Sequence, residues 1–340
     1  MQSLVKRARK LLTAPRDTFT LLKFLPDSSV LGGELTYPRT SQGKPLVRVF
    51  SLAPRTGKQT TQATFPFVDS AGGTEPVFAP DGSALLGITD DESGFIVHVL
   101  SIDGKRHHCW VLEKANPSIS EVLHHATGPI WIDHGRAWAV LAFRHRGDEP
   151  TSELFVVTGR RTEPGKFRLL SLGRSDTGIE DCFHPDAFQG QYGFASFDLG
   201  ELLECPEGES IVGMRGTMQI GYRPQLFRYT FHLSDPARSR QVTQIPFPLV
   251  GMFSRISYSP ISKRLGVFAI QKRDIKEIKK LGTRTIYELS VIGMDGSKRI
   301  ELGMLSCYYS GPFPRQLQWL PDGKRLCFEF KGSFYVLDSE

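Results

Sequence analysis

The sequence has few cysteines, and they show no spacing that would suit a disulfide framework or a structural metal site. The five are Cys109, Cys182, Cys205, Cys307 and Cys327. An odd number argues against a disulfide-stapled secreted fold. The lack of any CxxC pair argues against a zinc knuckle. The cysteine pattern therefore predicts a reducing compartment.

Long hydrophobic runs are also missing. No stretch of about 18 apolar residues occurs, so the sequence predicts no membrane-spanning helix. The N-terminal segment MQSLVKRARKLLTAPRD is basic, but it lacks the continuous apolar core of a signal peptide. Together with the cysteines, these absences predict a cytoplasmic protein.

Motifs of several enzyme classes are absent as well. The chain has no G-x-S-x-G nucleophile elbow, no G-x-x-x-x-G-K-[ST] phosphate loop and no dinucleotide-binding βαβ unit. Cys182 and His184 stand close together, but no local signature or third member marks them as a thiol nucleophile and its base. These absences argue against hydrolase, NTPase and dehydrogenase chemistry, and no cofactor is expected.

What the chain does have is ordinary globular composition with many turns. It contains 340 residues, 40% hydrophobic and 23% charged, which is enough to bury a large core. Its 33 glycines and 22 prolines are spread along the chain, as in an all-β protein. The net charge of +6 favours an acidic partner. We expect that partner to be another protein, with a nucleic acid as the weaker alternative.

A repeated phrase organises the sequence. In VFAPDGSALLGITDDESGFIVHVLSIDGK (77–105), a Pro-Asp-Gly turn precedes two alternating apolar runs that a polar loop joins. The phrase returns as QWLPDGKRLCFEFKGSFYVLDS (318–339) and, less sharply, around four other turns. The six turn positions are Ser28, Gly82, Gly135, Gly208, Ser262 and Gly323.

This spacing, about fifty to seventy residues, predicts an all-β fold consisting of a single β-propeller. Each repeat forms a small antiparallel sheet that cannot bury both faces alone, and stacking in a ring supplies the missing contacts. Six blades are expected, or seven if the long segment 173–199 hides another blade. The predicted organisation is a basic segment at 1–17 and a propeller at 18–340, with insertions at 173–199 and 271–285.

The phrase φ-x-P-D-G-x-x-L, followed by a paired strand that ends near D-G-K, resembles the repeat of TolB-type propellers. Related blades occur in the non-catalytic domains of prolyl-oligopeptidase-type enzymes. The resemblance extends from about Thr18 to Asp338. It implies a fold rather than a function, because this fold hosts binding modules, scaffolds and some enzymes. It also implies that Asp27, Asp81 and Asp322 are turn formers.

One aromatic position recurs just before the turn and predicts blade-to-blade packing. Five copies of the repeat fill it with Phe24, Phe78, Trp131, Tyr258 and Trp319. The fourth copy departs, because Glu204 stands there. We interpret the five aromatic side chains as structural.

The last repeat contains only three strands, so the N-terminus is a candidate for the fourth. Residues 3–12 could form this closing strand. The apolar residues of the same segment also share one helical face, and Pro15 would end such a helix. A closing strand and a short amphipathic helix are both compatible with the sequence.

The hairpin loop of the fifth repeat carries the densest positive charge. In a propeller, such loops share a face with the loops that enter the innermost strands, and ligands usually bind there. The partner-binding candidates are Lys272, Arg273, Lys276, Lys279, Lys280 and Arg284. The leading hypothesis is a non-catalytic protein-interaction or scaffold propeller that uses this face.

Histidines near the same face support a rival hypothesis. His124, His125 and His184 fall in entering loops, and His145 falls in a hairpin loop. Imidazole is a common metal ligand, so His124, His125 and His184 are candidate ligands at the mouth of the channel. The alternative function is a metal-dependent enzyme that acts on an acidic or sugar-like substrate.

Overall fold

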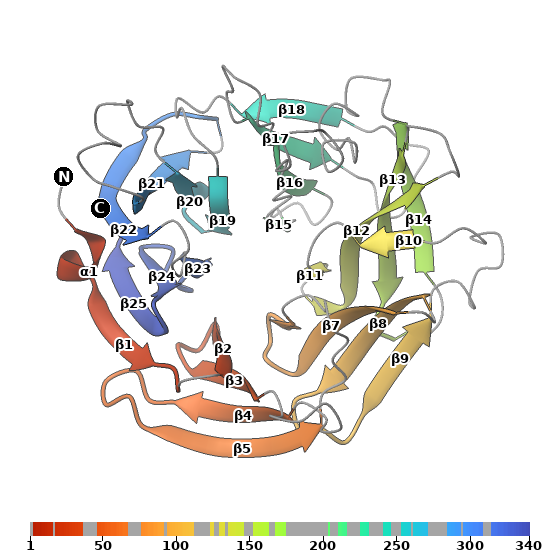
Figure 1. Cartoon of the computed structure of the whole chain (residues 1–340), viewed down its shortest axis with the longest axis horizontal. Coiled ribbons are helices and arrows are strands. Elements are labelled where there is room, and N and C mark those ends of the chain that lie inside the picture. The colour runs from red at the N-terminus through yellow and green to blue at the C-terminus, as the bar shows by residue number, and fades with distance from the viewer. Residues whose placement is uncertain are drawn as a thin grey trace.

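The strands of the chain form a ring of small antiparallel sheets (Figure 1). The computed structural model describes residues 3–15, 18–36, 46–66, 76–91, 94–111, 123–125, 129–132, 135–145, 152–162, 167–174, 203–204, 210–215, 225–230, 241–245, 253–259, 261–270, 284–293, 295–308 and 314–340. Six sheets are present among these residues, which confirms the predicted all-β propeller. The alternative of a seventh blade falls on residues that lie almost entirely outside the described ranges.

In blades 1, 2, 4 and 5 the strands are numbered outwards from the centre of the ring, while blades 3 and 6 depart from this order. Blade 1 contains β2 (Thr18–Phe24), β3 (Val30–Thr36), β4 (Leu46–Leu52) and β5 (Gln59–Pro66). Blade 2 contains β6 (Val77–Phe78), β7 (Ala84–Asp91), β8 (Gly94–Ser101) and β9 (His107–Val111). Blade 3 contains β10 (Leu123–His125), β11 (Ile130–Ile132), β12 (Ala137–His145), β13 (Ser152–Arg160) and β14 (Phe167–Arg174), with β10 and β11 both paired to β12.

The second half of the ring repeats this order. Blade 4 contains β15 (Leu203–Glu204), β16 (Ser210–Arg215), β17 (Gln225–Thr230) and β18 (Gln241–Ile245). Blade 5 contains β19 (Phe253–Ser259), β20 (Arg264–Ile270), β21 (Arg284–Gly293) and β22 (Ile300–Tyr308). Blade 6 contains β23 (Arg315–Trp319), β24 (Arg325–Phe330) and β25 (Ser333–Asp338), and its outermost strand is β1 (Arg9–Thr13).

At four of the six predicted turn positions, the described structure has a residue in the left-handed conformation. The described turns have positive φ at Ser28 (68°), Gly82 (70°), Gly135 (85°) and Gly323 (64°). In blade 5 Ser262 lies in the turn between β19 and β20, as predicted, but the left-handed residue is Lys263 (53°). The reason is a turn one residue longer, in which the Lys263 amide donates to the Ser259 carbonyl four residues earlier.

The aspartates of these turns hold the backbone in place. The carboxylates of Asp27 and Asp81 each accept a hydrogen bond of 2.9 Å from the amide two residues later. Asp322 accepts one of the same length from the Lys324 amide. At Asp27, the hydrogen bonds from Ser29 lower the carboxyl pKa below its ordinary value. The predicted role of the three residues as turn formers is confirmed.

The recurring aromatic position joins neighbouring blades. The Trp131 indole donates to the Val77 carbonyl of blade 2, and the Trp319 indole donates to the Ser257 carbonyl of blade 5, both at 3.0 Å. Each acceptor immediately precedes the aromatic residue of the preceding blade. The four residues Phe24, Phe78, Trp131 and Trp319 are buried, and Tyr258 is half-buried. The structural interpretation of this position is therefore confirmed.

The N-terminal segment contains one helical turn and then a strand. Helix α1 (Leu4–Arg7) buries Leu4 completely in the apolar cluster shared by blades 5 and 6. Strand β1 pairs antiparallel with β25, with Arg9 opposite Val336 and Thr13 opposite Ser333. The N-terminus thus supplies the outermost strand of the last blade, and the two ends of the chain close the ring together.

No helix among the described residues is long and apolar enough to cross a membrane.

Closure of the ring generates the first prediction. Leu11 of β1 is 7% exposed and packs with residues of blades 1 and 6, including Phe24, Phe50 and Phe334. Leu11→Ala should lower the free energy of unfolding by about 2–4 kcal/mol, because it leaves a cavity at the joint. Urea denaturation measures the change.

The matched control is Leu46→Ala on β4, whose side chain is 44% exposed. This substitution should change stability by less than about 0.5 kcal/mol. Equal losses in the two variants would show that β1 contributes no more than a surface strand does.

Candidate functional site

The predicted partner-binding loop lies almost wholly outside the described residues. Its six cations are Lys272, Arg273, Lys276, Lys279, Lys280 and Arg284. Of these, only Arg284 has a described backbone, as the first residue of β21. Partner binding by this loop stays a prediction.

The histidine candidates are placed only in part. His124 and His125 belong to β10 and lie opposite Phe143 and Ala142 of β12. Their side chains, and the whole of His184, fall outside what the structure describes. Among the described residues, no group of three or more potential metal ligands gathers. The metal site also stays a prediction.

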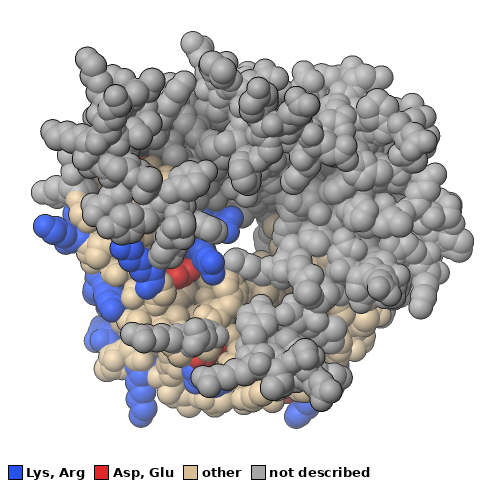
Figure 2. All heavy atoms as spheres, in the orientation of Figure 1, with Lys and Arg blue, Asp and Glu red and all other residues tan. Residues whose placement is uncertain are grey.

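A different basic surface follows the joint between blades 6 and 1. We call it the N-terminal basic strip, and it consists of Lys6, Arg7, Arg9, Lys10, Arg55 and Lys58, all exposed. Figure 2 shows basic side chains along the flank where Figure 1 draws α1 and β1. The strip is continuous across two blades, because the Arg9 guanidinium donates to the Pro54 carbonyl (3.1 Å) in the turn between β4 and β5.

The charges of this strip have no acidic counterparts in the part of the chain that is described. None of the six cations forms an ion pair with another described residue. The guanidinium of Arg7 donates to the Leu302 carbonyl, and that bond fixes the side chain without neutralising it. Such a surface attracts anionic groups, whose negative charge would pair with these cations.

Cations inside the blades behave differently. Arg48 on β4 pairs with Glu34, and Arg299 pairs with the fully buried Glu288. These pairs neutralise charges that burial would otherwise make costly. Exposed cations elsewhere are paired as well, as Lys105 is with Asp103, whereas the N-terminal basic strip forms no ion pair with a described residue.

The sequence analysis missed a pair of histidines in blade 2. His98 of β8 is buried, and its Nδ1 lies 3.1 Å from Nε2 of His107 on β9. The two rings are stacked, with centroids 5.4 Å apart. Burial, followed by the charge of His108, lowers the pKa of His107 below its ordinary value of 6.5. The available signal was a histidine at an inward position of the apolar strand 94–101.

This pair shares a single proton between the facing nitrogens, so one ring donates and the other accepts. Protonating both rings would remove the acceptor and place two positive charges side by side. A second charge beside the first would be unfavourable, which agrees in direction with the lowered pKa of His107.

Comparisons with known proteins identify no family for the chain. No protein-family description matches it, and no curated protein matches it. Solved structures match at low identity. TolB from Acinetobacter baumannii is 13% identical with a TM-score of 0.43, over 84% of this chain and 54% of that one. The chain thus spans about half the length of that TolB.

Two further structures match over more of their length. A putative TolB from Agrobacterium tumefaciens is 14% identical, with a TM-score of 0.46 over 94% of this chain and 90% of that one. The propeller domain of the Trilobed protease from Pyrococcus furiosus is 11% identical, with a TM-score of 0.47 over 96% and 82%. TolB proteins, which the repeat resembles, are thus among the matches, while the fold assignment rests on the six sheets themselves.

The histidine pair generates a pH prediction. The pKa of His107 is lower in the folded chain than in the unfolded one. As the pH falls through about 6.5, the unfolded chain therefore binds a proton that the folded chain does not, and the free energy of unfolding falls. His107→Gln should flatten this decrease between about pH 7 and pH 5, as urea denaturation at several pH values would measure.

The neighbouring residue provides the control. His108→Gln should keep most of the decrease, because burial is the larger cause of the lowered pKa of His107 and the charge of His108 the smaller. An unchanged pH dependence in His107→Gln would mean that other groups cause the acid sensitivity.

Proposed function

We propose that this propeller is a non-catalytic protein-interaction module that binds an acidic partner through the N-terminal basic strip. The observation that carries the proposal is the set of six exposed cations with no ion-pair partner among the described residues. Gathering like charges on one surface is unfavourable in the isolated protein. An acidic partner would turn that repulsion into attraction.

The strand edge favours a polypeptide as the partner. β1 pairs with β25 on one side, and no other described strand pairs with it. In the described part of the chain, this outer edge therefore has no strand partner, and an extended chain could match its backbone donors and acceptors. A partner segment that adds to this edge would form main-chain hydrogen bonds there, and its acidic side chains would reach Arg9 and Lys10. A nucleic acid has no such backbone pattern.

Cations on an edge strand can also serve to keep other chains away. That role would account for Arg9 and Lys10, which belong to β1. It does not account for Lys6 on α1, or for Arg55 and Lys58 in the turn of blade 1, because these residues lie off the strand. The extent of the strip across two blades favours a binding surface.

Other expectations belong to the same proposal. The basic loop at 271–285 is a second candidate contact for the partner. A cytoplasmic location is supported by the odd number of cysteines. The alternative metal-dependent enzyme would be supported by a stoichiometric transition metal that is lost on His124→Ala with His125→Ala.

Binding of a defined acidic peptide tests the proposal. The probe is a fluorescent twelve-residue peptide of alternating Glu and Val, compared with its Lys and Val counterpart by fluorescence anisotropy. Replacing Lys6, Lys10 and Arg55 by Gln should weaken binding of the acidic peptide at least about tenfold, because each lost charge contact weakens it several-fold. The basic peptide should not bind.

A matched variant controls for net charge. Lys105, Arg106 and Lys324 are exposed residues on other parts of the ring. Replacing them by Gln removes the same two lysines and one arginine and should leave the affinity nearly unchanged. Equal losses in the two variants would contradict a localised surface. Tighter binding of a single-stranded oligonucleotide than of the acidic peptide would contradict the choice of a protein partner.

A further inference from the structure

The N-terminal residues 3–14 contact three blades, and we call them the closing segment. Ser3 forms an isolated bridge with Met304 of blade 5. β1 pairs with β25 of blade 6, and just after β1 the Ala14 amide donates to the Gly332 carbonyl (2.7 Å). The segment reaches blade 1 at the turn between β4 and β5. It therefore holds these three blades together along the outer side of the ring (Figure 1).

Two side chains anchor the closing segment. Leu4 is fully buried and Leu11 is 7% exposed, whereas the other side chains of the segment are half-buried or exposed. β1 also has a register shift between Lys10 and Leu12. In β24 of the same blade, four of the six residues are buried. Because segments with few buried contacts open more easily than core strands, we expect the closing segment to open while the rest of blade 6 stays folded.

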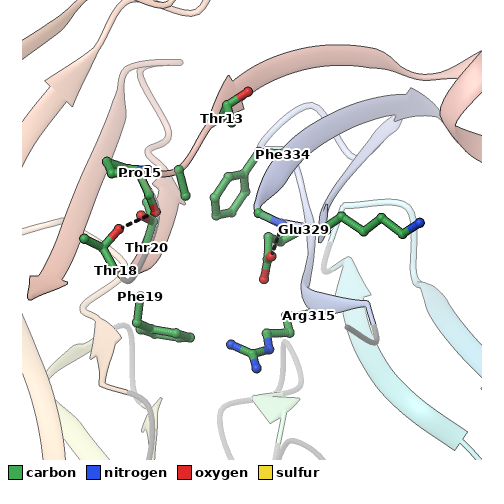
Figure 3. A pocket seen from close by; sticks show the side chains of 11 residues that line it. Thr13, Pro15, Thr18, Phe19, Thr20, Arg315, Glu329 and Phe334 are labelled. Atoms are coloured by element: carbon green, nitrogen blue, oxygen red, sulfur yellow. Dashed lines mark hydrogen bonds between the residues drawn. The ribbon is translucent and has the colours of Figure 1, made fainter. Parts of the chain in front are cut away.

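The end of the closing segment borders a cavity of about 600 Å³ (Figure 3). The stretch 13–15 forms one wall, and the other walls include Thr20 of β2 and Arg315 of β23. Figure 3 shows Thr13 and Pro15 bordering the same space as Arg315. This end of the segment therefore lacks the tight packing of a strand inside a blade, and it is held mainly by its backbone pairing with blade 6.

Docking of the closing segment brings like charges together. The turn between β4 and β5 carries Arg55 and Lys58, both exposed. The Arg9 guanidinium donates to a carbonyl of this turn (3.1 Å), and a Cβ atom added to Gly57 would lie 3.6 Å from the Leu11 carbonyl. β1 thus passes directly beside the turn. An open segment would carry its cations away from those of the turn, so the repulsion belongs to the docked state.

Apolar burial is the larger of these two effects. Each buried leucine favours the docked state by about tenfold or more. Repulsion between exposed cations is screened by salt and amounts to about two- to fivefold. The segment therefore stays docked in the free protein, and the repulsion changes how often it opens.

We propose that these like charges loosen the closing segment and that an acidic partner on the N-terminal basic strip closes it. The identity of the partner rests on the proposed function. The strip is complete only in the docked state, because its cations are divided between the closing segment and the turn of blade 1. A partner that contacts both parts binds the docked state more tightly, and this difference in affinity shifts the equilibrium toward the closed ring.

Closure by the partner would also protect blade 6. Opening of the segment uncovers the edge of β25, which β1 covers in the docked state. An uncovered strand edge can pair with other chains. The partner would therefore stabilise the fold in addition to being bound by it.

Hydrogen exchange of the β1 amides measures how often the segment opens. Replacing Arg55 and Lys58 by Gln removes the cations of blade 1 and leaves the segment itself unchanged. Exchange in β1 should slow at least about twofold, because the docked state loses its repulsion, while exchange in β24 stays the same. The difference from the unsubstituted protein should shrink in about 0.5 M KCl, which screens the repulsion.

The corresponding turn of blade 2 provides the matched control. Lys105 and Arg106, between β8 and β9, are exposed. Replacing them by Gln changes the net charge by the same amount and should leave exchange in β1 unchanged. Leu11→Ala removes an anchor and should accelerate this exchange, which would show that the measurement reports docking of the segment.

The peptide of alternating Glu and Val tests the closing step. At ten times its dissociation constant it should slow exchange in β1 up to about tenfold, the limit for a peptide that binds the docked state alone. Exchange in β9 of blade 2 should not change. The Lys and Val counterpart should slow neither strand.

Two results would overturn the proposal. The first is equal exchange in β1 for the blade 1 variant and its blade 2 control. The second is unchanged exchange in β1 while anisotropy shows the acidic peptide to be bound, a result that would leave the proposed function intact. A peptide that does not bind would contradict the proposed function and the closing step together. Exchange in the blade 1 variant would still support or overturn the loosening by like charges.

Discussion

The pairing of β1 with β25 is the interaction on which the rest of the architecture depends. It joins residues 320 positions apart, such as Thr13 and Ser333, and the logarithmic estimate of loop closure puts the entropic cost at about 5 kcal/mol. Burial of Leu4 and Leu11 recovers about 3–6 kcal/mol. The apolar contacts of these two residues thus roughly offset the cost of closure, and the hydrogen bonds of the strand add to them.

The remaining contacts are local, or they repeat from blade to blade. Apart from the β1–β25 pair of blade 6, each blade pairs strands that are near one another in sequence, so its own closure cost is small. The aspartates then stabilise equivalent turns within their blades, and the indoles of Trp131 and Trp319 connect neighbouring blades at corresponding places. The joint between blades 6 and 1 differs, because strands from both ends of the chain meet there. Residues at this joint need not follow the repeat pattern, so their packing can differ from the packing between the other blades.

The sequence predicted the repeated features of the structure, and few of the others. Asp27, Asp81 and the aromatic position were predictable because local turn chemistry and a periodic packing requirement fix them. The turn of blade 5 was placed correctly at Ser262, but its left-handed residue is Lys263, because the Lys263 amide closes a longer turn, and no residue type indicates that length. The N-terminal segment stayed ambiguous because its apolar residues suit either a helix or a strand. The structure uses Leu4 in the helical turn and Leu11 in the strand.

The candidate sites at the joint between blades 6 and 1 could not be predicted from the sequence, for a different physical reason. Thr20 and Arg315 belong to no sequence motif, and only closure of the ring brings them to one cavity. The same closure places Arg55 beside the cations of β1, which lie more than forty residues earlier. A motif search finds functional groups that are close in sequence or spaced by one element. Groups assembled by the meeting of the two chain ends have neither property, so the joint of a closed repeat fold has to be read from its three-dimensional structure.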